Sequence, residues 1–166
     1  YSVTKLANEH FAELFHKEHG LESVGLRYMS IYGPNEKSKG HFANLVSQFI
    51  WDIQSGRQPV VYGNGKQGRD FTYVKDVVKA NIAGLKSDEV GTFNIGTGVE
   101  TDVNSLFEHL KDIINTNKKS RYGPQKNGEQ KRSCLNVNFA KSKLNWEPCV
   151  SLQEGLTKTV QFFRNV

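Results

Sequence analysis

Cysteine is scarce in this 166-residue sequence, which contains only Cys134 and Cys149. Their spacing matches neither a paired-cysteine metal motif nor the dense framework of a small disulfide-linked domain. We therefore predict no metal site. Unpaired thiols are typical of a reducing cytoplasm, where we expect the protein to reside.

Long hydrophobic runs are also absent: no apolar stretch approaches the roughly 20 residues that a membrane-spanning helix needs. We therefore predict no membrane partner. The sequence opens at Tyr1 rather than at an initiator methionine. We expect it to be a segment of a longer protein, and no signal peptide can be read from it.

A dinucleotide-binding glycine loop is missing as well. Residues 63–68 spell G-x-G-x-x-G, but that fingerprint requires its glycines to follow a strand and to open a helix. The stretch that follows, residues 69–74, is instead extended and aromatic in character. We therefore interpret residues 63–68 as a turn, and we expect the segment alone not to hold a dinucleotide tightly.

The overall composition is typical of a globular protein, with 37% hydrophobic and 11% aromatic residues and a net charge of +5. Basic residues gather between Lys118 and Arg132, where Glu129 is the one acid. Such a cluster suits a solvated loop, a small phosphate ligand or a nucleic acid. No aromatic residues of the kind that stack on bases alternate with it, so we predict no nucleic-acid partner.

Hydrophobic periodicity predicts an α/β protein. Apolar residues recur at helical spacing over residues 1–19, 41–55, 76–86 and 102–114, and a capping box at Ser151 opens a last helix. Extended stretches lie at residues 23–31, 59–62, 70–74 and 92–98. We expect Thr101 or Asp102 to cap the helix that follows it.

Tyr1 and Lys5 are four residues apart on the first predicted helix, and therefore lie one turn apart on one face. An ammonium held beside a phenol favours the phenolate, so this spacing can carry proton transfer at neutral pH. The same spacing also arises by chance in many helices. The spacing alone leaves both interpretations open.

Four motifs in order indicate a family. They are YSVTKLANEH at residue 1, LRYMSIYGP at residue 26, RDFTYVKDV at residue 69 and FNIG at residue 93. Together they resemble the extended short-chain dehydrogenases, most closely the NAD-dependent nucleotide-sugar epimerases and dehydratases. The resemblance implies the rear part of a Rossmann-type parallel sheet with a small α/β substrate-binding domain. It implies the C-terminal portion of a 4-epimerase acting by transient oxidation at sugar C4.

The resemblance also implies roles for single residues. It makes Tyr1 and Lys5 catalytic and places them, with Tyr28, against NAD. It assigns to a nucleotide sugar, most simply a UDP-sugar, the residues Ser30, Asn44, Leu45, Val60, Tyr62, Arg69, Lys126 and Glu129. Ser30 stands where relatives carry an asparagine of longer reach, and Lys126 where they carry an arginine.

Alternatives remain for several of these residues. Asn44 could serve only as a helix cap, and Arg69 could form a surface salt bridge with Asp70 or Asp76. Arg121 or Arg132 could supply the guanidinium that Lys126 lacks. The segment could also come from a dehydratase, decarboxylase or reductase of the family, or act as a non-catalytic binding or dimerisation module.

Two further expectations concern organisation. We expect residues 1–34 and 70–97 to belong to the dinucleotide-binding domain, and residues 35–69 and 98–166 to the substrate domain. The apolar stripe of helix 1–19 requires cover. The resemblance implies a homodimer through this helix, whereas simple packing on the protein's own sheet is the alternative.

Overall fold

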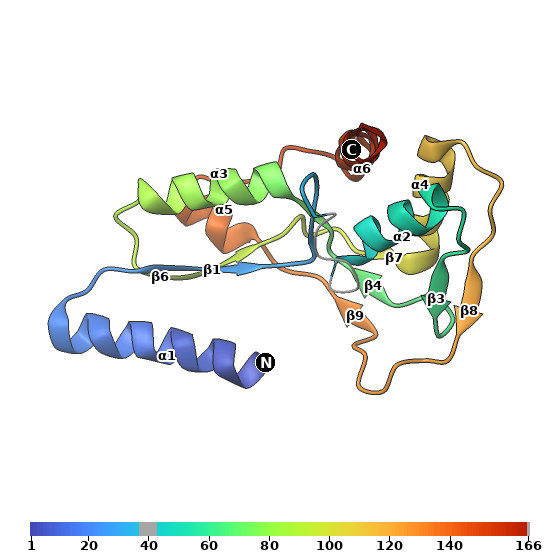
Figure 1. The fold of residues 1–166 in the computed structure, drawn as a ribbon. Coiled ribbons are helices and arrows are strands. Elements are labelled where there is room, and N and C mark those ends of the chain that lie inside the picture. Colours follow the sequence, from blue (N-terminus) through green and yellow to red (C-terminus); the bar gives the residue numbers. More distant parts are fainter. Residues whose placement is uncertain (37–42, 166) are drawn as a thin grey trace.

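The computed structural model describes residues 1–36 and 43–165. Helices and strands alternate along the chain (Figure 1). The helices are α1 (Ser2–His19), α2 (Leu45–Gln54), α3 (Val74–Leu85), α4 (Val103–Ile114), α5 (Asn138–Leu144) and α6 (Leu152–Arg164). The strands are β1 (Val24–Tyr28), β2 (Ile31–Tyr32), β3 (Val60–Tyr62), β4 (Gly68–Arg69), β5 (Thr72–Tyr73), β6 (Gly91–Ile95), β7 (Thr101–Asp102), β8 (Arg121–Gly123) and β9 (Arg132–Ser133).

Strand pairing is mostly parallel. Strand β1 pairs with β6, β2 with β5, β3 with β8 and β4 with β9, all in parallel, while β4 and β7 are antiparallel. Parallel strands need crossover connections, and helices supply most of them here. The predicted α/β class is therefore correct.

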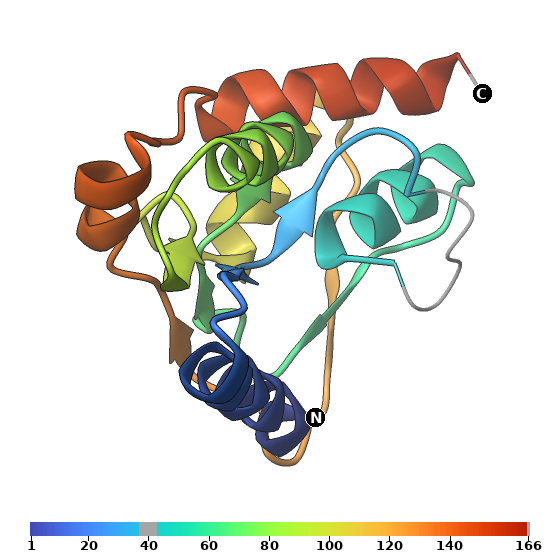
Figure 2. The same cartoon turned by 90° about the vertical axis from the view of Figure 1, so that its left-hand side faces the viewer.

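The hydrophobic core has two parts. One lies where α3 and α5 cover one face of the β1–β6 pair, and it contains Val77, Ala80, Phe93, Ile95, Ala140, Leu144 and Trp146 (Figure 1). The other lies among α2, α4 and α6, with Phe49, Ile50, Leu106, Leu110, Leu156 and Val160 at its centre. Helix α6 lies at the side of the molecule opposite α1 (Figure 2).

Side-chain caps fix where several helices begin. The Asp102 carboxylate accepts the N–H groups of Asn104 and Ser105, so Asp102 rather than Thr101 is the cap of α4. The Ser151 hydroxyl accepts the N–H of Glu154 and opens α6, as predicted. These bonds satisfy donors that the first turn of a helix cannot pair internally.

The predicted strand 23–31 is wrong in extent, because the chain bends at Ser30. Ser30 has φ +34°, in the left-handed region that residues with a side chain rarely adopt. Before the bend the Met29 N–H donates to Ile95 of β6, and after it the Ser30 carbonyl accepts from Thr72 of β5. The chain thus changes partner strands at Ser30.

The predicted strand 70–74 is also interrupted, at Asp70. This carboxylate is fully buried and accepts hydrogen bonds from the Thr97 N–H at 2.7 Å, the Thr97 hydroxyl at 2.6 Å and the Gly98 N–H at 3.0 Å. A buried charge needs such partners. Because Asp70 turns toward residues 97–98, β4 ends before it and β5 begins after it.

Two of the predicted helices begin at a different residue from the one predicted. Helix α3 begins at Val74, two residues earlier than predicted. Helix α1 begins at Ser2, with Tyr1 as its N-cap. Helix α2 begins at Leu45, and the start predicted at His41 lies outside the described residues.

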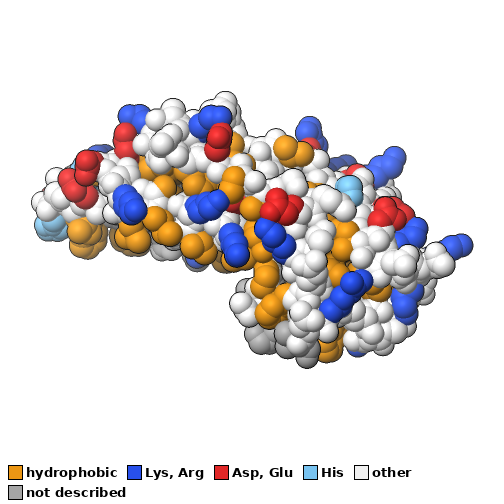
Figure 3. Space-filling model, turned by 90° about the horizontal axis from the view of Figure 1, so that it is seen from above, with side chains coloured by type: hydrophobic (Ala, Val, Ile, Leu, Met, Phe, Trp, Pro, Cys, Tyr) orange, Lys and Arg blue, Asp and Glu red, His pale blue; other side chains and the backbone are white. Residues whose placement is uncertain are grey.

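The face that α3 and α6 share is mixed in character. Val78 and Ile82 are exposed on α3, and Figure 3 shows hydrophobic side chains there among lysine, arginine and acidic side chains. Exposed apolar residues scattered among charges are usual on soluble surfaces and require no partner.

Candidate functional site

Tyr1 and Lys5 lie together, as their spacing predicts. The Nζ atom of Lys5 is 5.3 Å from the centroid of the Tyr1 ring, and the Lys5 N–H donates to the Tyr1 carbonyl at 3.1 Å. The Tyr1 side chain is 92% exposed. The phenol and the ammonium are therefore both accessible to a ligand.

A groove of about 1090 Å³ runs between α1 and the β1–β6 pair. Tyr1, Lys5 and Tyr28, the residues predicted to bind a cofactor, all line it, and so does Ser30. The hydroxyl of Tyr28 donates to the Asn81 side chain at 2.9 Å, which fixes its ring at the end of β1. The structure thus gathers two phenols and an ammonium on one groove.

Helix α1 presents its polar side to this groove. Asn8, Glu9 and Glu13 line the groove at helical spacing with Lys5. Glu9 forms a two-point ion pair with Arg27 of β1, with 2.7 Å between Glu9 Oε1 and Arg27 Nε. This pair ties α1 to the sheet.

The apolar stripe of α1 is exposed. Val3 is 79% and Phe11 60% exposed, and no residue of α1 among those described is buried. Within the described residues, the stripe does not pack on the β1–β6 pair. The polar residues between the stripe positions occupy the sheet-facing side instead.

A second cavity of about 220 Å³ lies beyond Ser30. Every residue predicted to contact the nucleotide sugar lines it: Ser30, Asn44, Leu45, Val60, Tyr62, Arg69, Lys126 and Glu129. These residues come from segments far apart in the sequence, and the fold gathers them in one place. Their roles toward a ligand stay predictions.

Arg69 and Glu129 form an ion pair in this pocket. Arg69 Nη2 lies 3.5 Å from Glu129 Oε1, and Arg69 Nη1 donates to the carbonyls of Gly68 and Gln130. The alternative partners predicted for Arg69 are wrong, because Asp70 accepts from residues 97–98 and Asp76 from Cys149. Backbone carbonyls and Glu129 hold the guanidinium at the pocket wall.

Lys126 lies over the Tyr62 ring, with Nζ 4.2 Å from the ring centroid. The face of a phenol ring attracts a cation in this geometry. The Gln67 side chain also donates to the Tyr62 carbonyl at 2.9 Å, so the Tyr62 position is fixed from two sides. Of the basic residues weighed for the phosphate site, Lys126 is the one that lines the pocket together with Arg69.

Arg132, the predicted alternative to Lys126, lies elsewhere. It pairs with Glu100 at 2.6 Å, and its hydrogen bonds to this carboxylate hold the pKa of Glu100 below its ordinary value. The Arg132 side chain is 81% exposed. It is not among the residues that line the pocket.

Asn44 performs the structural task that sequence analysis left open. Its Oδ1 accepts the Val46 N–H as the cap of α2, and its Nδ2 donates to the Ile31 carbonyl at 2.7 Å. Glu36 accepts the Asn44 N–H at 3.0 Å and the Ser47 hydroxyl at 2.7 Å. A carboxylate thus lies beside the start of α2, where helix geometry favours an anion.

The loop with the G-x-G-x-x-G pattern connects β3 to β4, so its interpretation as a turn is confirmed. Gly65 has φ +72°, and a Cβ there would lie 2.0 Å from Asn104 Oδ1. The Asn104 N–H donates to the Gly65 carbonyl. This glycine is needed for a close approach to α4.

Sequence analysis missed Gln48, Gln67, Phe71 and Val103, which also line the pocket. Gln48 lies one helical turn after Asn44, a spacing that could have indicated it. Gln67 lies in the loop that sequence analysis treated only as a turn. Phe71 and Val103 carry no chemical signal of their own.

Within the described ranges, no three histidine, cysteine or acidic side chains cluster as a metal site would require. The helices in the same ranges are too short or too polar to cross a membrane.

The GDP-mannose 4,6 dehydratase family model matches residues 1–159. The chain belongs to this family. It is 37% identical to a putative UDP-glucose 4-epimerase of Methanocaldococcus jannaschii, a match that covers 99% of this chain and 53% of that protein. It is 33% identical to UDP-glucuronic acid decarboxylase 1 of Arabidopsis thaliana, covering 99% of this chain and 38% of that protein.

Solved structures of the family agree. The crystal structure of a Thermotoga maritima UDP-glucose 4-epimerase with UDP-glucose is similar at a TM-score of 0.96 and 41% identity, covering 99% of this chain and 53% of that one. A Thermus thermophilus UDP-glucose 4-epimerase in complex with NAD gives a TM-score of 0.90 and 29% identity, covering 100% and 54%. The Rossmann-type α/β prediction is confirmed. The chain spans about half the length of the relatives it matches.

Proposed function

We propose that this chain is the C-terminal portion of an NAD-dependent nucleotide-sugar 4-epimerase that acts on a UDP-hexose. One observation carries the proposal: the eight residues expected to bind the nucleotide sugar line one pocket, and one of them, Ser30, also lines the groove that holds Tyr1 and Lys5. The similar proteins described as UDP-glucose 4-epimerases support the same reaction.

The residues of the groove suit the cofactor. Tyr1 and Lys5 line the groove from α1, and Tyr28 lines it from β1. Phenol and ammonium groups can hydrogen-bond the hydroxyls of a ribose. When bound, NAD would supply the acceptor and donor for hydride at sugar C4. The Lys5 cation, 5.3 Å from the Tyr1 ring, favours the phenolate.

Tyr1 is the proposed acid and base. As phenolate it takes the proton of the sugar 4-hydroxyl while hydride leaves C4, and it returns a proton after the keto sugar has turned. Lys5 stabilises the phenolate throughout.

The pocket is the proposed grip on the nucleotide. Arg69 binds the diphosphate with its planar guanidinium, and Glu129 accepts from the ribose hydroxyls. Asn44 and Leu45 lie at the start of α2, beside the diphosphate. Val60 and Tyr62 contact the uracil, Ser30 contacts the sugar, and Lys126 adds positive charge near the phosphates.

Replacing Tyr1 by phenylalanine in the complete protein tests the mechanism. The change removes one hydroxyl, and loss of a positioned acid–base group lowers kcat about 10²- to 10⁴-fold, while affinity for the UDP-sugar is nearly kept. Tyr122→Phe is a matched control, since Tyr122 is exposed on β8 and lines neither cavity. A Tyr1→Phe enzyme that keeps more than about a tenth of kcat would refute the mechanism.

A second candidate reaction is supported by the similarity to a UDP-glucuronic acid decarboxylase. Dehydratases and decarboxylases would use the same groove and pocket. Chromatographic analysis of products from UDP-glucose, UDP-galactose and UDP-glucuronic acid distinguishes these reactions. Interconversion of the two hexoses supports the epimerase, and release of carbon dioxide supports the decarboxylase. We expect the 166-residue chain alone to be inactive.

We also propose how the chain is organised. Residues 1–34 and 70–97 would belong to the dinucleotide-binding domain, and residues 35–69 and 98–166 to the substrate domain.

The exposed apolar stripe of α1 supports a homodimer through this helix. Sedimentation equilibrium of the complete protein and its Phe11→Asp variant tests this, with a monomeric variant as the expected result. Two free cysteines support a reducing cytoplasm.

A further inference from the structure

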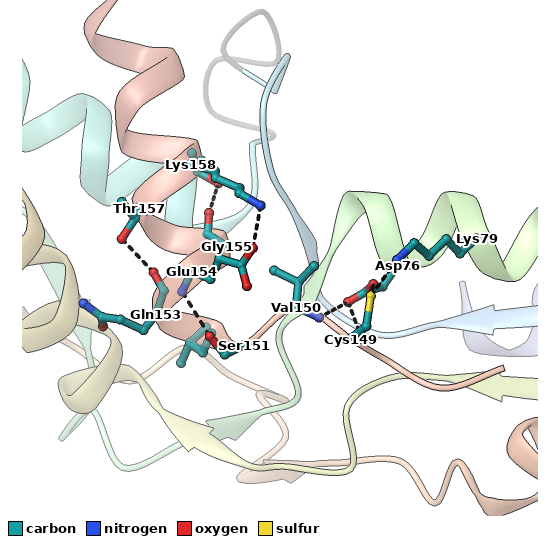
Figure 4. Close-up of polar contacts among 12 residues, drawn as sticks. Asp76, Lys79, Cys149, Val150, Ser151, Gln153, Glu154, Gly155, Thr157 and Lys158 are labelled. Atoms are coloured by element: carbon teal, nitrogen blue, oxygen red, sulfur yellow. Dashed lines mark hydrogen bonds and ion pairs between the residues drawn. The ribbon is translucent and has the colours of Figure 1, made fainter.

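Cys149 and Lys79 are in direct contact (Figure 4), and they line neither the groove nor the pocket. The Nζ atom of Lys79 donates to Cys149 Sγ at 2.6 Å, and the Asp76 Oδ1 atom lies 3.0 Å from the same sulfur. Cys149 is exposed. A nucleophilic sulfur and an amine therefore meet at the surface, and a buried carboxylate contacts the sulfur from below.

Asp76 fixes this geometry. Its carboxylate is fully buried and accepts the N–H groups of Cys149 at 3.2 Å and Val150 at 3.0 Å (Figure 4). The indole of Trp146 donates to the Asp76 carbonyl at 3.0 Å. The segment that precedes α6 is thus anchored to the first turn of α3. Lys79 follows Asp76 by three positions on the same helix face, so its amine reaches the anchored sulfur.

The pair has the properties of a reactive thiol site. Oxidants attack the thiolate form of a cysteine. The Lys79 ammonium, in contact with Cys149 Sγ, can pair with the charge of that form. The hydrogen bond to Cys149 raises the pKa of Lys79 above its ordinary value, so the positive charge is present at neutral pH. Exposure of Cys149 gives small oxidants access.

We propose that Cys149 and Lys79 form a redox modification site, in which a hydroperoxide oxidises Cys149 and the Lys79 amine then bonds to the sulfur. In the first step the thiolate attacks the peroxide: an S–O bond forms, the O–O bond breaks, and the leaving oxygen takes a proton to become water or an alcohol. The sulfur is oxidised by two electrons to a sulfenic acid, and the peroxide is reduced.

In the second step the nitrogen of Lys79 attacks the sulfur. An S–N bond forms, the S–O bond breaks, and the departing hydroxide takes a proton from nitrogen to leave as water. Before this attack the Lys79 ammonium releases one proton to solvent, which is easier once oxidation has removed the negative charge of the thiolate. The product is a sulfenamide, which thiols reduce back to the starting pair.

The bond would join the two parts of the hydrophobic core. Lys79 belongs to α3, whose Val77 and Ala80 lie in one part, and Cys149 precedes α6, whose Leu156 lies in the other. A covalent link there restricts relative movement of the two parts. This role is independent of the proposed epimerase reaction.

Peptide mapping by mass spectrometry, after limited treatment of the complete protein with hydrogen peroxide, tests the proposal. We expect a linked pair of peptides containing Lys79 and Cys149, lighter than the reduced peptides by two hydrogens, about 2 Da. Dithiothreitol should restore both. Cys134 is an internal comparison, since it is also exposed but burial raises the pKa of its thiol above the ordinary value. We expect Cys149 to react at least about tenfold faster than Cys134.

Lys79→Arg is the decisive variant. It keeps a cation beside the sulfur but removes the nucleophilic amine, so Cys149 should still oxidise quickly while the linked peptides disappear. Because Lys79 is a surface side chain, this variant avoids the folding risk of changing Cys149. Equal reaction rates of Cys149 and Cys134, oxygen retained on Cys149 without a link, or a link that keeps an oxygen atom would each overturn the proposal.

Discussion

The Nζ atom of Lys5 lies 5.3 Å from the centre of the Tyr1 ring, on the groove side of α1. The cation is therefore placed to stabilise the phenolate. Lys5→Met in the complete protein should lower kcat by on the order of a hundredfold, with little change in UDP-sugar affinity. Lys158→Met is the control, since Lys158 is also a helical lysine paired with a glutamate, Glu154, but lines neither the groove nor the pocket. Steady-state kinetics measure both, and equal kcat values would exclude the role of Lys5.

Arg69→Ala should weaken UDP-sugar binding by about 1.5 to 3 kcal/mol, the loss expected for hydrogen bonds to a charged group. NAD affinity should change little, because Arg69 does not line the groove of Tyr1 and Lys5. Arg132→Ala is the matched control, since Arg132 pairs with Glu100 outside the pocket. Isothermal titration with each ligand gives the result. Equal losses for UDP-sugar and NAD would mean that Arg69 is structural.

The Glu9–Arg27 pair should make the free energy of unfolding depend on pH in the acid range. The hydrogen bond from Arg27 holds the pKa of Glu9 below its ordinary value. The pair therefore stabilises the folded protein fully at pH values above the ordinary pKa of glutamate. This stabilisation is lost as the pH falls through the lowered pKa that Glu9 has in the folded protein. In Arg27→Met, the free energy of unfolding should therefore fall less between about pH 6 and pH 3 than in the wild type. Urea denaturation at several pH values measures this.

The double variant Glu9→Gln with Arg27→Met provides the internal check. Because each single change already breaks the pair, the double variant should show no further flattening of the pH dependence. Additive effects of the two changes would show that Glu9 and Arg27 act on stability separately.

Gly155→Ala should destabilise the protein. A Cβ at this position of α6 would lie 2.1 Å from the hydroxyl oxygen of Tyr32, which is buried in the core. Overpacking of this kind costs about 1 to 3 kcal/mol. Gly84→Ala is the control. Gly84 lies in another helix, α3, and a Cβ there would lie 3.1 Å from Val24, which is a less severe contact. Thermal unfolding compares the two.

Removing the clashing atom should restore part of the loss. In the double variant Gly155→Ala with Tyr32→Phe, the nearest neighbour becomes the ring carbon at 2.9 Å, so relief is incomplete. If Tyr32→Phe gives no recovery at all, the cost of Gly155→Ala has another origin.

Local sequence patterns predicted which helices and strands are present better than they predicted the residues at which these elements begin and end. Helix periodicity and capping residues such as Ser151 and Asp102 act within a few positions, so the sequence contains what is needed to identify them. The break at Ser30 depends on strands β5 and β6, which lie far along the chain. The turn at Asp70 likewise depends on Thr97 and Gly98.

The candidate site shows the same division. The family resemblance identified eight residues of the pocket but not Gln48, Gln67, Phe71 or Val103. It also did not identify the partner of Arg69, which is Glu129, 60 positions away. Periodicity showed that α1 has an apolar stripe, but not that its polar side faces the sheet. Contacts between distant segments decide both features.

Ser30 lies on the walls of both cavities. The residues proposed to anchor the nucleotide therefore lie on one side of this point, and the proton-transfer pair lies on the other. A nucleotide sugar bound in this way would be fixed at its nucleotide and free at its sugar. The sugar could then rotate about the bonds to the diphosphate while the nucleotide stays bound. In the proposed epimerase, the side chain at residue 30 would then limit how large a rotating sugar fits. A longer side chain there would select against bulky sugars before any bond is broken.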